Sequence, residues 1–217
     1  MQDFEITAHI DHTCLNAYAT YEDIKKLCET AIRLKTASVC IPPTFVKPAF
    51  DEFGDRLAIC TVIGFPLGYH TTEVKLLETA QCLADGASEI DMVINIGDAK
   101  AGRFDKITDE IRTLKGAVGK DRILKVIIET CYLTDDEKIA LCHCVSEAGA
   151  DYIKTSTGFG SAGATLEDVK LFKEHIAPNV KIKAAGGIRT RESMQQYLEL
   201  GCDRIGSSSA AAIFDKQ

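Results

Sequence analysis

The stretch Asp151-Tyr152-Ile153-Lys154-Thr155-Ser156-Thr157-Gly158 gives the first indication of the fold. It is a short apolar run that ends in a polar, glycine-containing turn, which is typical of a buried strand followed by a loop. Similar apolar runs recur from one end of the chain to the other. Together they predict eight strands, of which the first and last are short and weakly marked, at residues 9–11, 38–41, 57–65, 89–95, 123–129, 152–155, 181–185 and 204–206.

Segments with helical periodicity separate these runs. Apolar residues recur at the i, i+3, i+4, i+7 spacing of an amphipathic helix over 21–34 and 72–84, and again within 107–118 and 139–145. Thr20, Thr134 and Thr165 are candidate N-caps, each with an acidic residue three positions later. Strands that alternate with helices indicate a parallel sheet. Eight nearly even units predict a closed (β/α)8 barrel, the TIM-barrel architecture, as a single domain over residues 1–217.

The composition narrows the class of protein. The formal net charge of −7 disfavours a nucleic-acid partner, and 46% hydrophobic residues disfavour disorder. We expect no membrane association, because no apolar stretch approaches the ~20 residues needed to span a bilayer. The first residues do not resemble a secretory signal. Nine scattered cysteines suit reduced thiols in a cytoplasmic protein better than a disulfide framework.

Three ionisable residues lie inside strands that should otherwise be apolar. Side chains alternate between the two faces of a strand, so Lys154, Lys183 and Asp91 should point into the barrel while their isoleucine neighbours face the helices. Active sites of such barrels form at the carboxyl ends of the strands. Two lysines on consecutive strand ends cannot both keep their protons easily, and a neutral lysine is a nucleophile toward aldehydes and ketones. The alternative is a structural ion pair, for example between Lys183 and Asp91.

Further polar residues belong to the same interior face. Lys125 shares an inward face with Glu129, but it lies deeper, and we interpret it as a charge partner of the reacting groups. Asp11 ends the first strand and should reach the cavity, unless it forms a turn with Thr13. Cys40 is expected to line the same cavity.

Three glycine-rich turns follow the last three strands. Glycines let backbone amides approach an anion, and barrels of this kind often bind phosphate after the seventh and eighth strands. Cys142-His143-Cys144 falls within a helical pattern, where neighbouring side chains diverge, and no second cluster completes a metal site. The predicted phosphate-binding residues are Thr157, Gly158, Gly186, Gly187, Gly206, Ser208 and Ser209.

The chain resembles the 2-deoxy-D-ribose 5-phosphate aldolases, a family of class I aldolases, from about residue 6 to residue 212. The motifs that carry the resemblance are Ile10-Asp11-His12-Thr13, Val62-Ile63-Gly64-Phe65-Pro66-Leu67-Gly68, Glu89-Ile90-Asp91-Met92-Val93-Ile94-Asn95-Ile96-Gly97, Lys125-Val126-Ile127-Ile128-Glu129-Thr130, Tyr152-Ile153-Lys154-Thr155-Ser156-Thr157-Gly158-Phe159 and Lys183-Ala184-Ala185-Gly186-Gly187-Ile188-Arg189.

The resemblance implies a role for each matching position. Lys154 matches the Schiff-base lysine, and Lys183 matches the second lysine, which depresses the pKa of the first and serves a proton relay. Asp91 matches the acid of that relay, while Asp11 and Cys40 match lesser active-site positions. It further implies reversible cleavage of 2-deoxyribose 5-phosphate to glyceraldehyde 3-phosphate and acetaldehyde, within the catabolism of deoxyribose phosphate.

The family also implies no metal and no cofactor, since the iminium acts as the electron sink, phosphosugar and aldehyde as substrates, and a homodimer. The chain departs from common family patterns at Cys14 to Ala17, at Ile41-Pro42-Pro43, at Phe159 and in a tail without tyrosine at 214–217. Three alternatives stay open: another Schiff-base or transaldolase-like barrel, a phosphosugar isomerase or epimerase, and a sugar-phosphate-binding barrel without activity.

Overall fold

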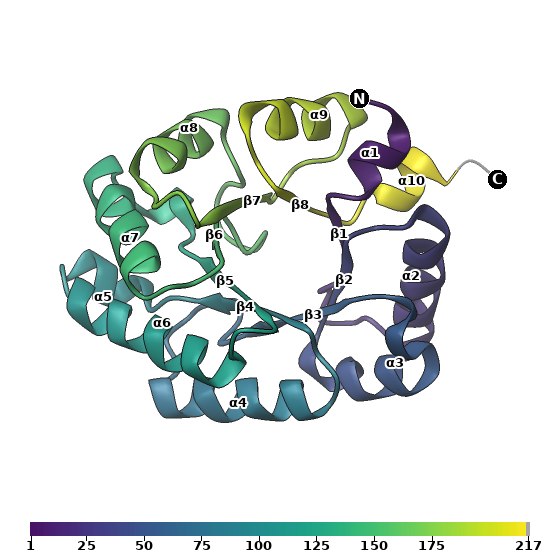
Figure 1. Ribbon diagram of the computed structural model, residues 1–217, viewed down its shortest axis with the longest axis horizontal. Helices are drawn as coiled ribbons and strands as arrows, with labels where there is room; N and C mark the ends of the chain where they lie inside the picture. The colour runs from purple at the N-terminus through teal and green to yellow at the C-terminus, as the bar shows by residue number, and fades with distance from the viewer. Residues whose placement is uncertain (216–217) are drawn as a thin grey trace.

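A computed structural model describes residues 1–215. Within them, eight parallel strands form a closed ring in chain order, and helices surround that ring (Figure 1). The predicted barrel is therefore confirmed. The strands are β1 (Ile10–Thr13), β2 (Ser38–Ile41), β3 (Ile59–Ile63), β4 (Glu89–Val93), β5 (Ile123–Ile127), β6 (Tyr152–Lys154), β7 (Lys181–Ala185) and β8 (Arg204–Ser207).

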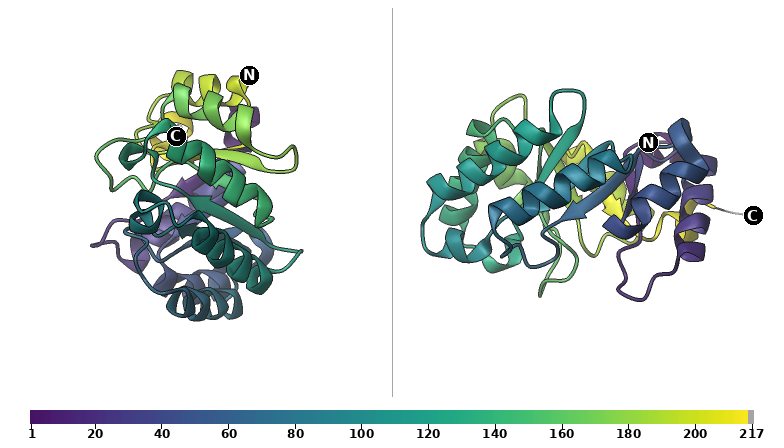
Figure 2. Two further views of the ribbon diagram at one scale, coloured as in Figure 1. Left: turned by 90° about the vertical axis from the view of Figure 1, so that its left-hand side faces the viewer. Right: turned by 90° about the horizontal axis from the view of Figure 1, so that it is seen from below.

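The main helices lie outside the ring, where they cover the strands, as the side views in Figure 2 also show. They are α2 (Tyr21–Leu34), α3 (Val46–Phe53), α4 (Thr72–Ala84), α6 (Phe104–Val118), α7 (Asp135–Glu147), α8 (Leu166–His175) and α9 (Arg191–Leu200). Shorter elements complete the fold: α1 (Asp3–Thr7), α5 (Ile96–Lys100), α10 (Ala210–Phe214), η1 (Pro43–Phe45), η2 (Gly54–Arg56) and η3 (Thr130–Tyr132).

Local signals in the sequence place the starts of three helices correctly. The hydroxyls of Thr20, Thr134 and Thr165 accept hydrogen bonds from the backbone amide three residues later, as predicted for N-caps. The sequence patterns did not single out α3 or α9. α3 follows directly on the short η1 turn and has only eight residues, so its periodicity is brief.

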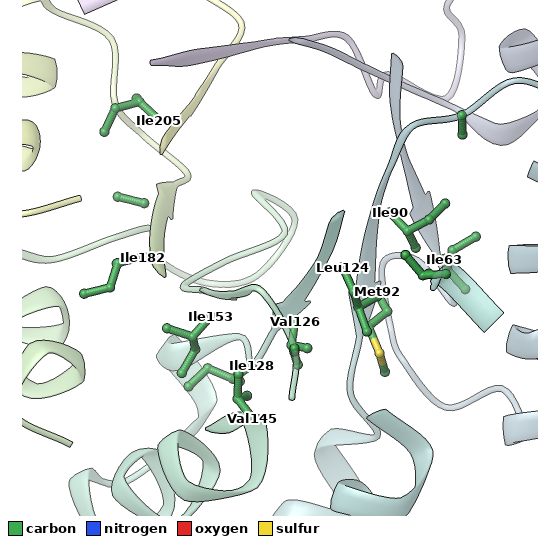
Figure 3. Close-up of a cluster of buried hydrophobic side chains, with 14 of the residues drawn as sticks. Ile63, Ile90, Met92, Leu124, Val126, Ile128, Val145, Ile153, Ile182 and Ile205 are labelled. Carbon is green, nitrogen blue, oxygen red and sulfur yellow. The ribbon is translucent and has the colours of Figure 1, made fainter. Parts of the chain in front are cut away.

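The hydrophobic core lies between the barrel and the helices. Outward-facing residues of successive strands, such as Ile90, Val126, Ile153 and Ile182, are almost completely buried there (Figure 3). The opposite face of the same strands points into the ring and carries charged residues instead. None of the helices within residues 1–215 combines the length and the apolar character that crossing a bilayer requires.

Candidate active site

Asp91 lies at the centre of the barrel interior, between three lysines. Its Oδ2 accepts hydrogen bonds from the Nζ atoms of Lys154 and Lys183, both at 2.7 Å, and its Oδ1 lies 2.9 Å from Lys125 Nζ. Pairing between neighbouring strands explains this meeting, because Asp91 is in register with Lys125 and Lys154 with Lys183. The three residues predicted to carry the chemistry are therefore brought together.

A second layer of charges lies toward the amino ends of the strands. Arg204 Nη1 is 2.5 Å from Asp11 Oδ1 and 3.1 Å from Glu89 Oε2, and Glu89 Oε2 is 2.5 Å from Lys125 Nζ. Asp11 also contacts Lys183. The turn with Thr13 considered for Asp11 is not formed by its side chain, because the Thr13 hydroxyl bonds the Asp11 backbone carbonyl instead. Sequence analysis assigned no role to Arg204 or Glu89, although Glu89 lies two residues before Asp91 and so faces the same side of its strand.

We call these seven residues the ion cluster: Asp11, Glu89, Asp91, Lys125, Lys154, Lys183 and Arg204. With every group ionised, four cations face three carboxylates, so 4 − 3 leaves one positive charge in excess. An uncompensated charge in a buried site is costly.

The cluster sets the protonation of its deeper members. Burial alone would lower the pKa of Lys183, but the carboxylates of Asp11 and Asp91 outweigh it and raise that pKa. Burial would raise the pKa of Asp91, yet the ammonium groups of Lys125, Lys154 and Lys183 hold it well below the ordinary value. Lys183 therefore remains a cation and Asp91 a carboxylate. Lys183 forms the interior ion pair with Asp91 and is also the neighbour of Lys154 on the next strand.

Lys154 is the lysine of the cluster that reaches a pocket. The pocket has a volume of about 330 Å³ and opens where the strands end. Glycine turns form much of its wall, and Gly158, Gly186 and Gly187 take positive φ values of 89°, 88° and 78° that disfavour other residues. Its lining comprises Thr13, Cys14, Leu15, Asn16, Lys154, Thr157, Gly158, Phe159, Ala185, Gly186, Gly187, Ile188, Arg189, Gly206, Ser207 and Ser208.

Five of the predicted site residues do not line this pocket: Asp11, Asp91 and Lys183 belong to the ion cluster, and Cys40 and Ser209 lie elsewhere. Cys40 is completely buried, packs with Cys60 and Val62 and does not line the pocket, contrary to expectation. A hydrogen bond with Cys60 lowers the pKa of Cys40, against the effect of burial. Ser209 precedes α10, and its backbone amide donates to Ser207 Oγ at 3.1 Å. The other predicted phosphate-binding residues all line the pocket.

Arg189 also lines the pocket, and sequence reasoning gave it no role. It follows the turn at Gly186 and Gly187, and its side chain is exposed. A guanidinium forms paired hydrogen bonds with phosphate oxygens. The signal available in the sequence was the position of an arginine two residues after two glycines at a strand end.

Fold and site together define a (β/α)8-barrel enzyme with a buried lysine–carboxylate cluster beneath a pocket of glycine turns. The model of the DeoC/LacD family aldolases matches residues 6–213, and the chain belongs to this family. It is 60% identical over 213 residues to the deoxyribose-phosphate aldolase of Clostridium botulinum strain Alaska E43, covering 98% of this chain and 96% of that protein.

Further comparisons agree with this assignment. The deoxyribose-phosphate aldolase of Clostridioides difficile is 52% identical over 96% of this chain and 94% of its own. Among solved structures, the tetrameric deoxyribose phosphate aldolase from Aeropyrum pernix superposes with a TM-score of 0.91 at 29% identity, covering 99% of this chain and 91% of that one. An N-acetylmannosamine-6-phosphate 2-epimerase from Clostridium perfringens, at 14% identity and a TM-score of 0.67, shares only the fold.

Proposed function

We propose that this chain is a class I deoxyribose-phosphate aldolase, which reversibly cleaves 2-deoxyribose 5-phosphate to glyceraldehyde 3-phosphate and acetaldehyde. The activity of the close relatives supports the reaction. The observation that carries the mechanism is the position of Lys154, which lines the pocket while its Nζ contacts Asp91. In this proposal the Lys154 amine reacts in its neutral form, beside the cationic Lys183 on the next strand.

In the cleavage direction, neutral Lys154 attacks the C1 aldehyde of the open-chain sugar, and loss of water gives an iminium. Asp91, through water and with Lys183 as its cationic neighbour, removes the proton of the C3 hydroxyl. The electrons of the C2–C3 bond then pass into the iminium as glyceraldehyde 3-phosphate leaves. The remaining enamine is protonated at carbon and hydrolysed to acetaldehyde, which frees Lys154.

The glycine turns accept the other end of the substrate in this proposal. Thr157, Gly158, Gly186, Gly187, Gly206 and Ser208 line the pocket together with Arg189, and we assign the phosphate to this wall. Cys40 and Ser209 lie outside the lining, so we give neither a direct contact with substrate. Asp11 is wholly buried in an ion pair with Lys183, and it acts by holding that cation in place.

Trapping of the Schiff base tests the mechanism. Borohydride reduction in the presence of acetaldehyde should add one ethyl group to the protein, and peptide mapping should place it on Lys154. A matched sample without acetaldehyde should gain no mass. A transaldolase-like enzyme would not use acetaldehyde as the donor, and a sugar-phosphate sensor or an isomerase would form no adduct. Absence of the adduct on Lys154 would therefore contradict the proposed role.

We also propose that the chain forms a homodimer. Val74 and Leu77 on α4 are 50% and 72% exposed, and Leu67 and Tyr69 in the preceding loop are exposed as well. Exposed apolar patches mark interaction surfaces. Sedimentation should give a dimer for the parent, and Leu77→Asp should shift it toward monomer, whereas Lys170→Asp on α8 should not. A parent that sediments as a monomer at micromolar concentration would contradict this.

A cytoplasmic location is the final part of the proposal. All nine cysteines are free thiols in the structure, which suits a reducing compartment. The aldolase activity of the source cells should fractionate with the cytosol rather than with secreted material.

A further inference from the structure

Glu129 is strained and buried beside the pocket. It follows β5 and adopts φ 55° and ψ 67°, a left-handed conformation that costs free energy for a residue with a side chain. Lys35 is the other described non-glycine residue with a positive φ, and it sits at the ordinary C-cap position of α2. Glu129 is only 2% exposed and does not line the pocket. Such strain persists only where the surroundings hold it.

The side chain of Glu129 is held by the loop that follows β6. The backbone amide of Thr157 donates to Glu129 Oε1 at 3.2 Å, and the hydroxyl of Thr157 donates to Oε2. The amide of Phe159 in turn donates to Thr157 Oγ1 at 3.0 Å. Glu129 therefore fixes, directly or through one hydroxyl, both ends of the segment 157–159.

The direction of these hydrogen bonds depends on the carboxylate. An ionised carboxylate can only accept, so the Thr157 hydroxyl must point its hydrogen at Glu129 and offer its lone pair to Phe159. Burial raises the pKa of Glu129, and the hydrogen bonds from Thr157 oppose that rise. The amide and the hydroxyl of Thr157 both donate to Glu129, and this arrangement fits an ionised carboxylate.

We propose that Glu129 is a positioning residue for the phosphate of the substrate. It would act through Thr157 and Gly158, which line the phosphate end of the pocket, and would touch neither the substrate nor the reacting atoms. The inference rests on the proposed function, in which these two residues face the phosphate. Holding the loop in its bound form before the substrate arrives lowers the entropic cost of binding.

The experiment compares 2-deoxyribose 5-phosphate with 2-deoxyribose, which has the same aldehyde and no phosphate. Glu129→Gln keeps the shape but replaces one acceptor oxygen with an NH2 group, so the Thr157 amide and hydroxyl no longer each have an oxygen of their own. We expect KM for the phosphorylated sugar to rise about tenfold with kcat nearly unchanged, the pattern of lost ground-state binding. The kcat/KM for 2-deoxyribose should stay within about threefold of the parent. Competitive inhibition by inorganic phosphate should weaken in parallel with KM.

Glu110→Gln is the matched control, because Glu110 is another buried acid, 6% exposed, that pairs with Lys75 at 2.9 Å and lies away from the pocket. It should lower thermal stability without separating the two sugars. If Glu129→Gln fails to fold, Glu129→Asp shortens the reach of the carboxylate to Thr157 and should give the same separation. Equal losses with both sugars, or no loss with either, would overturn the proposal. Trapping of acetaldehyde on Lys154 in the parent and in Glu129→Gln tests the proposed function separately.

Discussion

Lys154→Ala should lower kcat for cleavage of 2-deoxyribose 5-phosphate by about 10⁴-fold or more, because it removes the nucleophile and with it the covalent route. Lys154→Arg should be as inactive, since a guanidinium keeps the positive charge but does not condense with an aldehyde. The loss should appear in single-turnover as well as steady-state measurements. Neither variant should form a borohydride-stable adduct with acetaldehyde.

Lys154→Ala should still fold, because the charges of the ion cluster are balanced in it. The variant leaves three cations and three carboxylates, so the ion cluster becomes neutral (3 − 3 = 0). Asp91 keeps its contacts with Lys125 and Lys183 in this variant, and a urea midpoint measured beside kcat separates loss of chemistry from loss of structure. Lys170→Ala, at an exposed position on α8, controls for removal of a lysine elsewhere. Activity of Lys154→Ala within tenfold of this control would exclude Lys154 as the nucleophile.

Asp91→Asn should have the second largest effect, and it should act on both activity and stability. The substitution leaves four cations facing two carboxylates, so the excess charge rises to 4 − 2 = +2. Breaking a buried ion pair typically costs about 3–5 kcal/mol. Loss of the base should lower kcat by about 10²–10⁴-fold. Urea denaturation and steady-state kinetics measure the two effects independently.

The dependence of the free energy of unfolding on pH, on the acid side, also reports the ionisation of Asp91. Because its pKa is depressed in the folded state, Asp91 contributes stability above its unfolded pKa of about 3.9, and that contribution disappears as the pH falls below this value. The free energy of unfolding of Asp91→Asn should therefore depend less on pH on the acid side than that of the parent.

Asp168→Asn is the matched control for Asp91→Asn. Asp168 is also buried, pairs with Lys138 at 2.7 Å and lies on α8 outside the ion cluster. It should cost stability without the loss of kcat. An Asp91→Asn enzyme that keeps the parent's kcat would remove Asp91 from the proton relay and leave it a structural role alone.

The sequence by itself determined the barrel and the face on which each charge lies. Strand and helix periodicities are local, so β2, β7, α2 and α4 could be bounded to the residue from the pattern of apolar side chains. The same alternation placed Asp91, Lys154 and Lys183 inside the ring. Resemblance to a family then supplied the reaction, which periodicity cannot give.

Only the tertiary structure decided which interior charges meet and which residues form the pocket. Asp91 lies 63 and 92 positions from Lys154 and Lys183, and barrel closure sets the height at which these side chains face one another. Alternation gives the face of a strand but neither its stagger nor the reach of a side chain, so Arg204 and Glu89 went unrecognised as partners. For the same reason alternation suggested that Cys40 lines the pocket, whose lining does not include it. The left-handed turn of Glu129 likewise depends on a loop from another strand, because hydrogen bonds from Thr157 hold the strained backbone in place.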